Sequence, residues 1–245
     1  MVRMHPRVAG PELDAWVLHD LSVDHRVTDR AGAAERAADM LRERMIDGYL
    51  RPGTRLSEDA LGEALSVSRN TLREAFRLLT HERLVEHRLH RGVFVRRLTP
   101  DDVRDLYRLR HLLEGGALAT AEPSLPAPAL DQARHAVEQG EQAWARGDHQ
   151  GVGTSNMRFH AAIVALSRST RAEEVMRGVL AELRLVFHEA DDPAKLHEPY
   201  LRRNRELLEL LLGGDLDAAE TSLRTYLQDA EVQLVAAAGL NRPGS

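Results

Sequence analysis

Apolar positions near the start of the chain recur at helical spacing. Within residues 32–47 they stand three or four apart and share one face of a helix: Ala34, Ala37, Ala38, Leu41 and Met45. The next stretch, GYLRPGTRL, has glycine or proline at three positions, which ends a helix. The pattern therefore predicts a helix over 32–47 followed by a loop.

Two further short helices are predicted before residue 84. Ser57 precedes Glu58 and Asp59, which is the pattern of an N-cap followed by acidic first-turn residues, and this helix runs to residue 65. The stretch VSRNTLREAF begins a third helix that reaches about Arg83. Its apolar side chains recur at packing spacing and are expected to face the other helices: Leu72, Ala75, Phe76 and Leu79.

The hydrophobic pattern then changes to alternation. Residues 84–98, LVEHRLHRGVFVRRL, alternate toward a turn at Gly92 and predict a two-stranded hairpin. Three short helices followed by a hairpin make a winged helix-turn-helix, which we assign to residues 30–98. Residues 1–29 are expected to form an N-terminal arm, either disordered or packed on a partner subunit.

The patterns after Arg97 are helical only. They cover roughly 100–120, 127–146, 149–167, 171–189, 195–212 and 215–238, separated by stretches such as EPSLPAP, RGDHQ and LGGD. The predicted fold is therefore mostly α, with an N-terminal winged helix-turn-helix followed by an all-α helical bundle over residues 99–240.

Composition and charge narrow the class of protein. The chain has no cysteine, which excludes disulfides, thiolate metal sites and a cysteine nucleophile. It shows neither a signal-peptide pattern nor eighteen consecutive apolar residues, so we expect a cytoplasmic protein without membrane contact. The net charge of -5 is uneven, because residues 30–98 carry 14 arginines and 10 acidic residues whereas residues 99–245 are acidic overall. This asymmetry suggests a phosphate-facing module beside an acidic one.

Candidate DNA contacts lie at the start of the third predicted helix and on the hairpin. A helix-turn-helix places the first residues of its second helix in the major groove, where Arg can bind guanine, Asn can bind adenine and Ser can hold phosphate. The candidates are Ser68, Arg69, Asn70 and Arg73 on the helix and Arg88, His90, Arg91 and Gly92 on the wing. The alternative is an ordinary exposed amphipathic helix, which would not account for the preceding cap and turn and the following wing.

Residues 48–95, with their Pro-Gly pair and their VSR..LREA and RG.FV motifs, resemble the DNA-binding domain of the GntR superfamily of bacterial transcription regulators. The stretch DLYRLRHLLEGGALATA and the helices after it resemble the helical FCD ligand-binding domain of the FadR branch. The resemblance implies that Arg69, Arg73 and the wing around Gly92 contact operator DNA. It also implies a homodimer that binds short palindromes, and a small carboxylate or related metabolite whose binding relieves repression.

The resemblance further implies a metal site, with Asp and His four residues apart on one helix and two histidines on the last two helices. Here the matching positions hold Asn156, His160, Asn204 and Tyr226, which the turn between the last two helices should bring together. Amide and phenol groups are poor donors for transition metals, so we expect no divalent metal and no other cofactor. The four side chains suit hydrogen bonding to an organic effector instead.

Arg110 is a further candidate for the effector site. It stands where the family has an arginine, and it could pair with a ligand carboxylate or with Glu114 at i+4. His188 and His197, which flank EADDPAKL, are weaker candidates.

The sequence thus favours a ligand-responsive transcription regulator that is not an enzyme. One alternative is a DNA-binding regulator without an effector, whose pocket is a water-filled vestige. The other is a metal-dependent hydrolase that uses the pocket around His160, although no Ser-His-Asp set or glycine-rich phosphate loop accompanies it.

Overall fold

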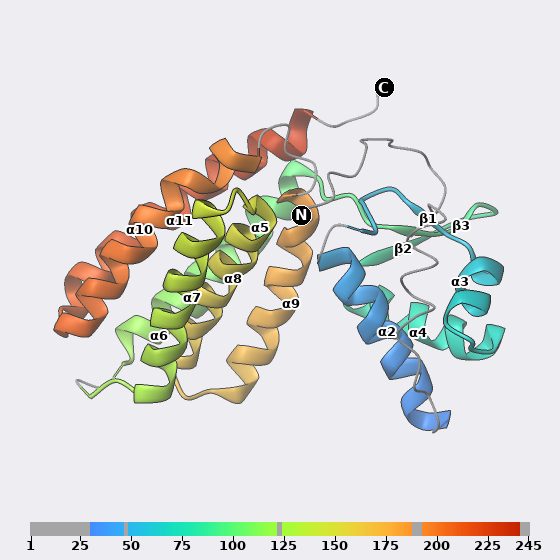
Figure 1. Ribbon diagram of the computed structural model, residues 1–245, viewed down its shortest axis with the longest axis horizontal. Coiled ribbons are helices and arrows are strands. Elements are labelled where there is room, and N and C mark those ends of the chain that lie inside the picture. Colours follow the sequence, from blue (N-terminus) through green and yellow to red (C-terminus); the bar gives the residue numbers. More distant parts are fainter. Residues whose placement is uncertain (1–29, 47–48, 122–123, 188–192, 241–245) are drawn as a thin grey trace. The chain divides into compact units, whose positions relative to one another are not determined.

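The computed structural model describes residues 30–46, 49–121, 124–187 and 193–240 (Figure 1). The chain divides into two compact units between Arg97 and Leu98. The N-terminal arm assigned to residues 1–29 lies outside the described residues, and so does His188. No helix within the described ranges is long and apolar enough to cross a membrane.

Three helices form the first part of the N-terminal unit: α2 (Arg30–Ile46), α3 (Glu58–Ala64) and α4 (Arg69–His81). The apolar face predicted for α2 is buried, as are Leu72, Ala75, Phe76 and Leu79 of α4. Ser57 caps α3 by accepting a hydrogen bond from the Ala60 amide at 3.3 Å, as the sequence predicts. The helices are therefore held together by the faces that the spacing of apolar residues indicates.

A small antiparallel sheet completes this unit. Its strands are β1 (Arg55–Leu56), β2 (Val85–Arg88) and β3 (Gly92–Val95), in the order β1-β3-β2. The sequence predicts only the β2–β3 hairpin. The two-residue β1 is too short to show alternation, and it forms because β3 offers a free edge, where Leu56 stands opposite Val93. The structure thus adds one strand to the predicted hairpin.

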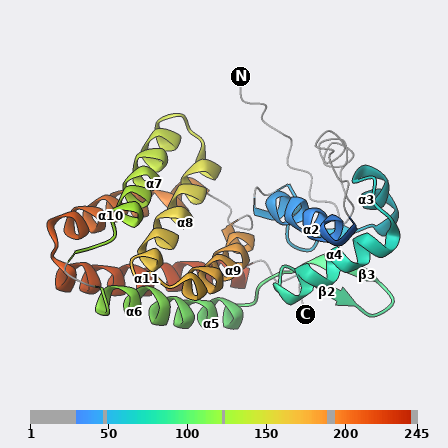
Figure 2. The ribbon, with the colours of Figure 1, turned by 90° about the horizontal axis from the view of Figure 1, so that it is seen from below.

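The second unit is entirely helical within its described residues. Its elements are α5 (Pro100–Arg110), η1 (His111–Gly115), α6 (Gly116–Ala119), α7 (Ala127–Ala145), α8 (His149–Ala165), α9 (Thr170–Phe187), α10 (Pro193–Gly213) and α11 (Leu216–Leu240). The helix α8 packs against α7, α9 and α10, while α11 packs along α5 and α6 (Figure 2). The mostly α fold class, a winged helix-turn-helix plus a helical domain, is confirmed.

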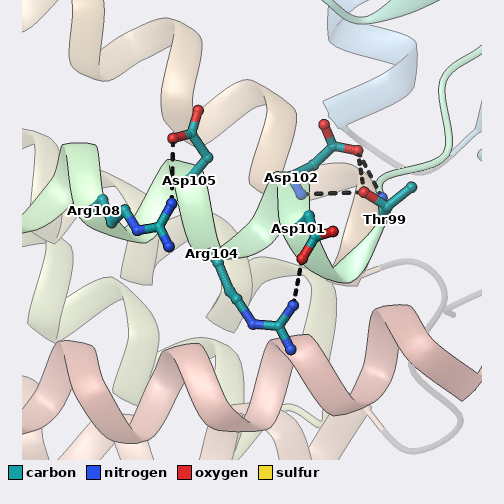
Figure 3. Close-up of polar contacts among 6 residues, drawn as sticks. All are labelled: Thr99, Asp101, Asp102, Arg104, Asp105 and Arg108. Carbon is teal, nitrogen blue, oxygen red and sulfur yellow. Dashed lines mark hydrogen bonds and ion pairs between the residues drawn. The ribbon is translucent and has the colours of Figure 1, made fainter.

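The first helix of this unit, α5, begins with a capping box and carries an ion pair on its exposed face. Thr99 and Asp102 form a capping box, in which the Thr99 hydroxyl accepts from the Asp102 amide at 3.2 Å and the Asp102 carboxylate accepts from the Thr99 amide at 2.8 Å (Figure 3). Arg104 pairs with Asp101 at 2.6 Å on the exposed face.

The predicted continuous helix over 100–120 is interrupted at residues 111–115 by a π-helical turn. Its one buried residue is Glu114, a carboxylate inside the helical unit. Such turns are rare and frequently occur at functional sites.

Candidate functional site

The start of α4 presents the predicted DNA contacts on its exposed face. Arg69, Asn70 and Arg73 are exposed, while the apolar residues that follow are buried. Ser68 is the N-cap of the helix, since its hydroxyl accepts from the Thr71 amide at 3.1 Å. This places the free amides of a 13-residue helix beside two guanidinium groups, an arrangement that favours phosphate and base edges.

Both arginines of this face are paired with acidic residues of α3. Arg69 lies 2.9 Å from Asp59, and Arg73 lies 2.9 Å from Glu58. The arginine side chains nevertheless remain 72% and 64% exposed. Exposed pairs of this kind contribute about 0–1 kcal/mol, so DNA can replace the carboxylates. The sequence shows these acids only as first-turn residues, because their contact with α4 depends on how the two helices cross.

The wing separates one anchored arginine from two outward side chains. The Arg88 guanidinium binds Glu86 at 2.6 Å and lies 4.4 Å from the centroid of the Phe94 ring. His90 and Arg91 are exposed at the turn between β2 and β3. Gly92 has φ +97°, a conformation that disfavours other residues. The wing geometry therefore leaves His90 and Arg91 better placed than Arg88 to reach outward.

In the helical unit, the structure brings together the four side chains expected to converge. The Asn156 side-chain oxygen accepts hydrogen bonds from the Asn204 amide at 2.7 Å and from the Tyr226 hydroxyl at 2.8 Å. The rings of His160 and Tyr226 meet edge to face, with centroids 4.8 Å apart. These residues come from α8, α10 and α11. Their part in binding an effector stays a prediction.

A buried ion pair adjoins this cluster. Arg110 donates from Nε to Glu114 at 2.7 Å, and His160 donates from Nδ1 to the other carboxylate oxygen at 2.6 Å. Arg110 is 3% exposed, while Glu114 and His160 are fully buried. Of the two partners considered for Arg110, the structure shows Glu114. The pair lies in the core rather than on the surface, where such i, i+4 pairs are usual.

The charges of this triad follow from its surroundings. Burial alone would raise the pKa of Glu114, but Arg110 and His160 outweigh it and hold that pKa below its ordinary value. Burial lowers the pKa of His160, and burial together with the charge of Arg110 outweighs the Glu114 carboxylate, which raises it. Glu114 is therefore ionised and His160 neutral at pH 7. Since Nδ1 carries the proton that binds Glu114, the Nε2 atom of His160 is an acceptor.

Several buried polar atoms near these groups have no hydrogen-bond partner. They include Nε2 of His160, one terminal nitrogen of Arg110 and the side-chain oxygen of Asn204. Two small cavities lie against the cluster, each with a volume of about 10 Å³, and both are lined by Asn156 and Tyr200. That volume admits about one water molecule.

The residues present do not fit the metal that the family resemblance implies. The oxygen of Asn156 already accepts two hydrogen bonds, and burial raises the pKa of Tyr226 well above its ordinary value, so its phenol stays neutral. His160 Nε2 is then one good donor among neutral oxygen groups, which is insufficient for a transition metal. Over the described part of the chain, no group of three or more His, Asp or Glu side chains is placed to hold a metal ion.

Three residues of this site were not singled out from the sequence as effector contacts. From the sequence, Glu114 is predicted only as a possible partner for Arg110, and no role is predicted for Tyr107 or Tyr200, which line the cavity. Spacing could have identified both tyrosines, because Tyr107 precedes Arg110 by three residues and Tyr200 precedes Asn204 by four. The side chain of His197, a weaker candidate, lies outside the described residues.

Comparisons with known proteins agree with both units. The family described as "Bacterial regulatory proteins, gntR family" matches residues 33–95, and the FCD domain family matches residues 105–229. An HTH-type transcriptional regulator of Streptomyces ambofaciens is 30% identical over 193 residues, covering 77% of this chain and 79% of the relative. A probable D-xylose utilization operon transcriptional repressor of Paenarthrobacter nicotinovorans is 26% identical, over 81% of this chain and 87% of the relative.

A solved structure shows the same architecture. The crystal structure of a GntR transcriptional regulator from Rhodococcus sp. RHA1 superposes with a TM-score of 0.79 at 44% identity, covering 83% of this chain and 98% of that one. The matched families and relatives are regulators rather than enzymes, which excludes the metal-dependent hydrolase as an interpretation. The exposed basic start of α4 and the helical second unit are thus explained together: this chain belongs to the GntR family of DNA-binding transcription regulators, with a C-terminal FCD domain.

Proposed function

We propose that operator affinity in this regulator is controlled by a small molecule that binds the buried polar cluster of the FCD domain. The observation that supports it is the set of unpartnered buried atoms around His160 and Asn204. Buried polar groups are normally hydrogen-bonded, and a ligand or water must complete these. A scaffold that served only for oligomerisation would gain stability from apolar residues there.

DNA recognition is assigned to α4 and the wing. Arg69 and Arg73 exchange their α3 carboxylates for base edges or phosphates, and Asn70 lies on the same exposed surface. Ser68 binds phosphate less readily than the sequence suggests, because its hydroxyl already caps α4. On the wing, His90, Arg91 and the Gly92 backbone approach DNA, while Arg88 positions the strand through Phe94.

The functional unit is a homodimer that works in the cytoplasm as a repressor. A two-fold symmetric operator requires two recognition helices about one DNA turn apart, and a dimer supplies them. A relative that covers most of this chain is named a repressor, which supports the sign of regulation.

Selection from a random duplex DNA library tests the proposed DNA recognition and the proposed homodimer. We expect enrichment of a short palindrome, bound by a particle with the light-scattering mass of a dimer. A library that shows no enrichment, or a strict monomer both free and on DNA, would contradict it. A thermal-shift screen of metabolites, followed by a DNA-release assay for each hit, separates an effector-controlled regulator from one without an effector.

A further inference from the structure

We propose that the effector is an uncharged, polyhydroxylated molecule of the sugar or sugar-alcohol class, and that Glu114 excludes carboxylates from the place beside Arg110. This inference rests on the proposed function, in which the FCD domain binds an effector. It departs from the carboxylate that the family resemblance implies.

The first step concerns the anion that Arg110 already has. Glu114 binds both Arg110 and His160 through its two carboxylate oxygens, at 2.7 Å and 2.6 Å. The described core around them thus contains one cation and one anion with a neutral histidine. A ligand carboxylate would bring a second negative charge into a buried site with one guanidinium, and like charges there are strongly unfavourable.

The second step concerns the atoms that remain without partners. His160 Nε2 and the Asn204 oxygen are both acceptors, so they require hydrogen-bond donors. A carboxylate has no proton to donate. The free nitrogen of Arg110 requires an acceptor. Hydroxyl groups can donate and accept, so one neutral polyhydroxylated ligand can satisfy all three atoms.

The third step concerns the aromatic lining. The whole chain has four tyrosines, and three of them, Tyr107, Tyr200 and Tyr226, line one cavity together with Asn156. The guanidinium groups of Arg110 and Arg203 already lie 4.9 Å and 5.9 Å from the centroids of the Tyr107 and Tyr200 rings. The tyrosines therefore supply apolar contact surface for a ligand, and the exclusion of a carboxylate rests on the buried charges of Arg110 and Glu114. Binding sites commonly combine such apolar lining with a few directed polar groups.

The size of the cavities indicates how binding is coupled to structure. Each holds about one water molecule, and Asn156 and Tyr200 line both. A ligand larger than water must therefore displace some of the side chains that line these cavities, and Asn156 is a candidate because it lines both. Displacing Asn156 breaks the bonds by which it joins α10 and α11, namely those to Asn204 and Tyr226. The ligand hydroxyls then replace these bonds, and the contact among the three helices changes.

Probe pairs that share a carbon skeleton and differ in charge at C1 test the proposal, and the open-chain alcohols xylitol and D-glucitol are the neutral members that match the open-chain acids in shape. D-xylose with D-xylonate and D-glucose with D-gluconate share a carbon skeleton, and the first pair is included because a relative is named for D-xylose utilisation. Millimolar concentrations avoid the general stabilisation that concentrated sugars cause. In titrations followed by thermal shift and DNA release, we expect a neutral member to bind the full-length protein about tenfold or more tightly than its acid.

The variant Glu114→Gln gives a more specific test, because it should reverse the preference for neutral ligands over acids. The substitution leaves Arg110 without an anion, so this variant should bind D-xylonate or D-gluconate more tightly than the sugars. Glu141→Gln is the matched control, because Glu141 is exposed and pairs with Arg205 at 2.6 Å. It should keep the wild-type preference. A folded Glu114→Gln protein that still rejects both acids would overturn the role assigned to Glu114.

The wild-type protein also gives results that need no variant. Nitrogen-15 NMR of histidine should show Nε2 of His160 without a proton, and a protonated Nε2 would overturn the requirement for donor ligands. Acids that bind wild-type protein while their sugars do not would overturn this inference and leave effector control intact. Absence of binding by every probe, with operator binding retained, would overturn this inference, whereas only a metabolite screen without a hit would contradict effector control.

Discussion

The buried pair between Arg110 and Glu114 gives a stability prediction with a large expected effect. Replacing Arg110 with Met keeps most of the side-chain volume but removes the guanidinium from a site where Arg110 is 3% exposed and Glu114 is fully buried. The Glu114 carboxylate then keeps only the proton on His160 Nδ1 as a described partner. Removing one member of a buried pair costs about 3–5 kcal/mol, because the other charge stays uncompensated.

The same reasoning predicts recovery in a double variant. Glu114→Gln removes the stranded charge and retains an oxygen that can accept from His160. Arg110→Met with Glu114→Gln should therefore recover about 2 kcal/mol of the loss, an energy within the range measured for contacting residues.

Urea unfolding followed by tryptophan fluorescence measures these costs. The chain has two tryptophans, and Trp144 lies in α7 of the FCD domain, so a Trp16→Phe background makes the signal specific to that domain. Arg104→Met is the matched control, because Arg104 forms an exposed pair with Asp101 and should cost at most about 1 kcal/mol (Figure 3). An Arg110→Met protein no less stable than this control would refute the reasoning.

Three further predictions concern phosphate contact, pH and metal. Arg91→Ala should weaken binding to all DNA sequences and lower the slope of log affinity against log salt by about 1, measured by anisotropy at several salt concentrations; an unchanged slope would argue against phosphate contact. The pKa of His160 is lowered from 6.5, so the unfolded chain binds the extra proton and the stability of the FCD domain should fall as pH drops below about 6.5, by at most about 1.4 kcal/mol per pH unit. His160→Gln should remove that loss of stability but keep the loss expected below pH 4.5, because the lowered pKa of Glu114 also makes stability fall as pH drops. A wild-type free energy of unfolding in urea that stays constant between pH 7 and pH 5 would contradict this prediction. Purified protein should contain no stoichiometric zinc or nickel by elemental analysis, and chelator should leave its melting temperature unchanged; one tightly held equivalent per chain would restore the family's metal site.

Much of the fold follows from periodicity. The faces of α2 and α4 are correct because apolar residues recur every three or four positions. The hairpin is correct because two short segments flank the turn before Gly92, and they pair as antiparallel β2 and β3 although β3 is buried at three consecutive positions. The strand β1 was missed because two residues cannot show a period, and its existence depends on β3. The π turn at residues 111–115 was missed for a similar reason, since HLLEG is compatible with an ordinary helix.

For the candidate sites, too, one part of the arrangement could be predicted from the sequence and another part could not. The convergence of Asn156, His160, Asn204 and Tyr226 could be expected from the family's spacing, which indicates which positions face one another. The hydrogen-bond partner of each of these buried side chains could not be predicted from the sequence. The sequence left Arg110 between a ligand and Glu114, and only three-dimensional packing shows that Glu114 also reaches His160, 46 residues away.

Contact between Arg69 and a base edge is the most direct test of DNA recognition by α4. The measurement is anisotropy titration of the selected operator and of operators changed at one base pair at a time, with wild type and Arg69→Ala. We predict that Arg69→Ala weakens operator binding by about 1–3 kcal/mol and loses the preference at one base position in each half-site. A folded variant that keeps wild-type affinity and preference at every position would contradict the assignment of α4 as the reading helix.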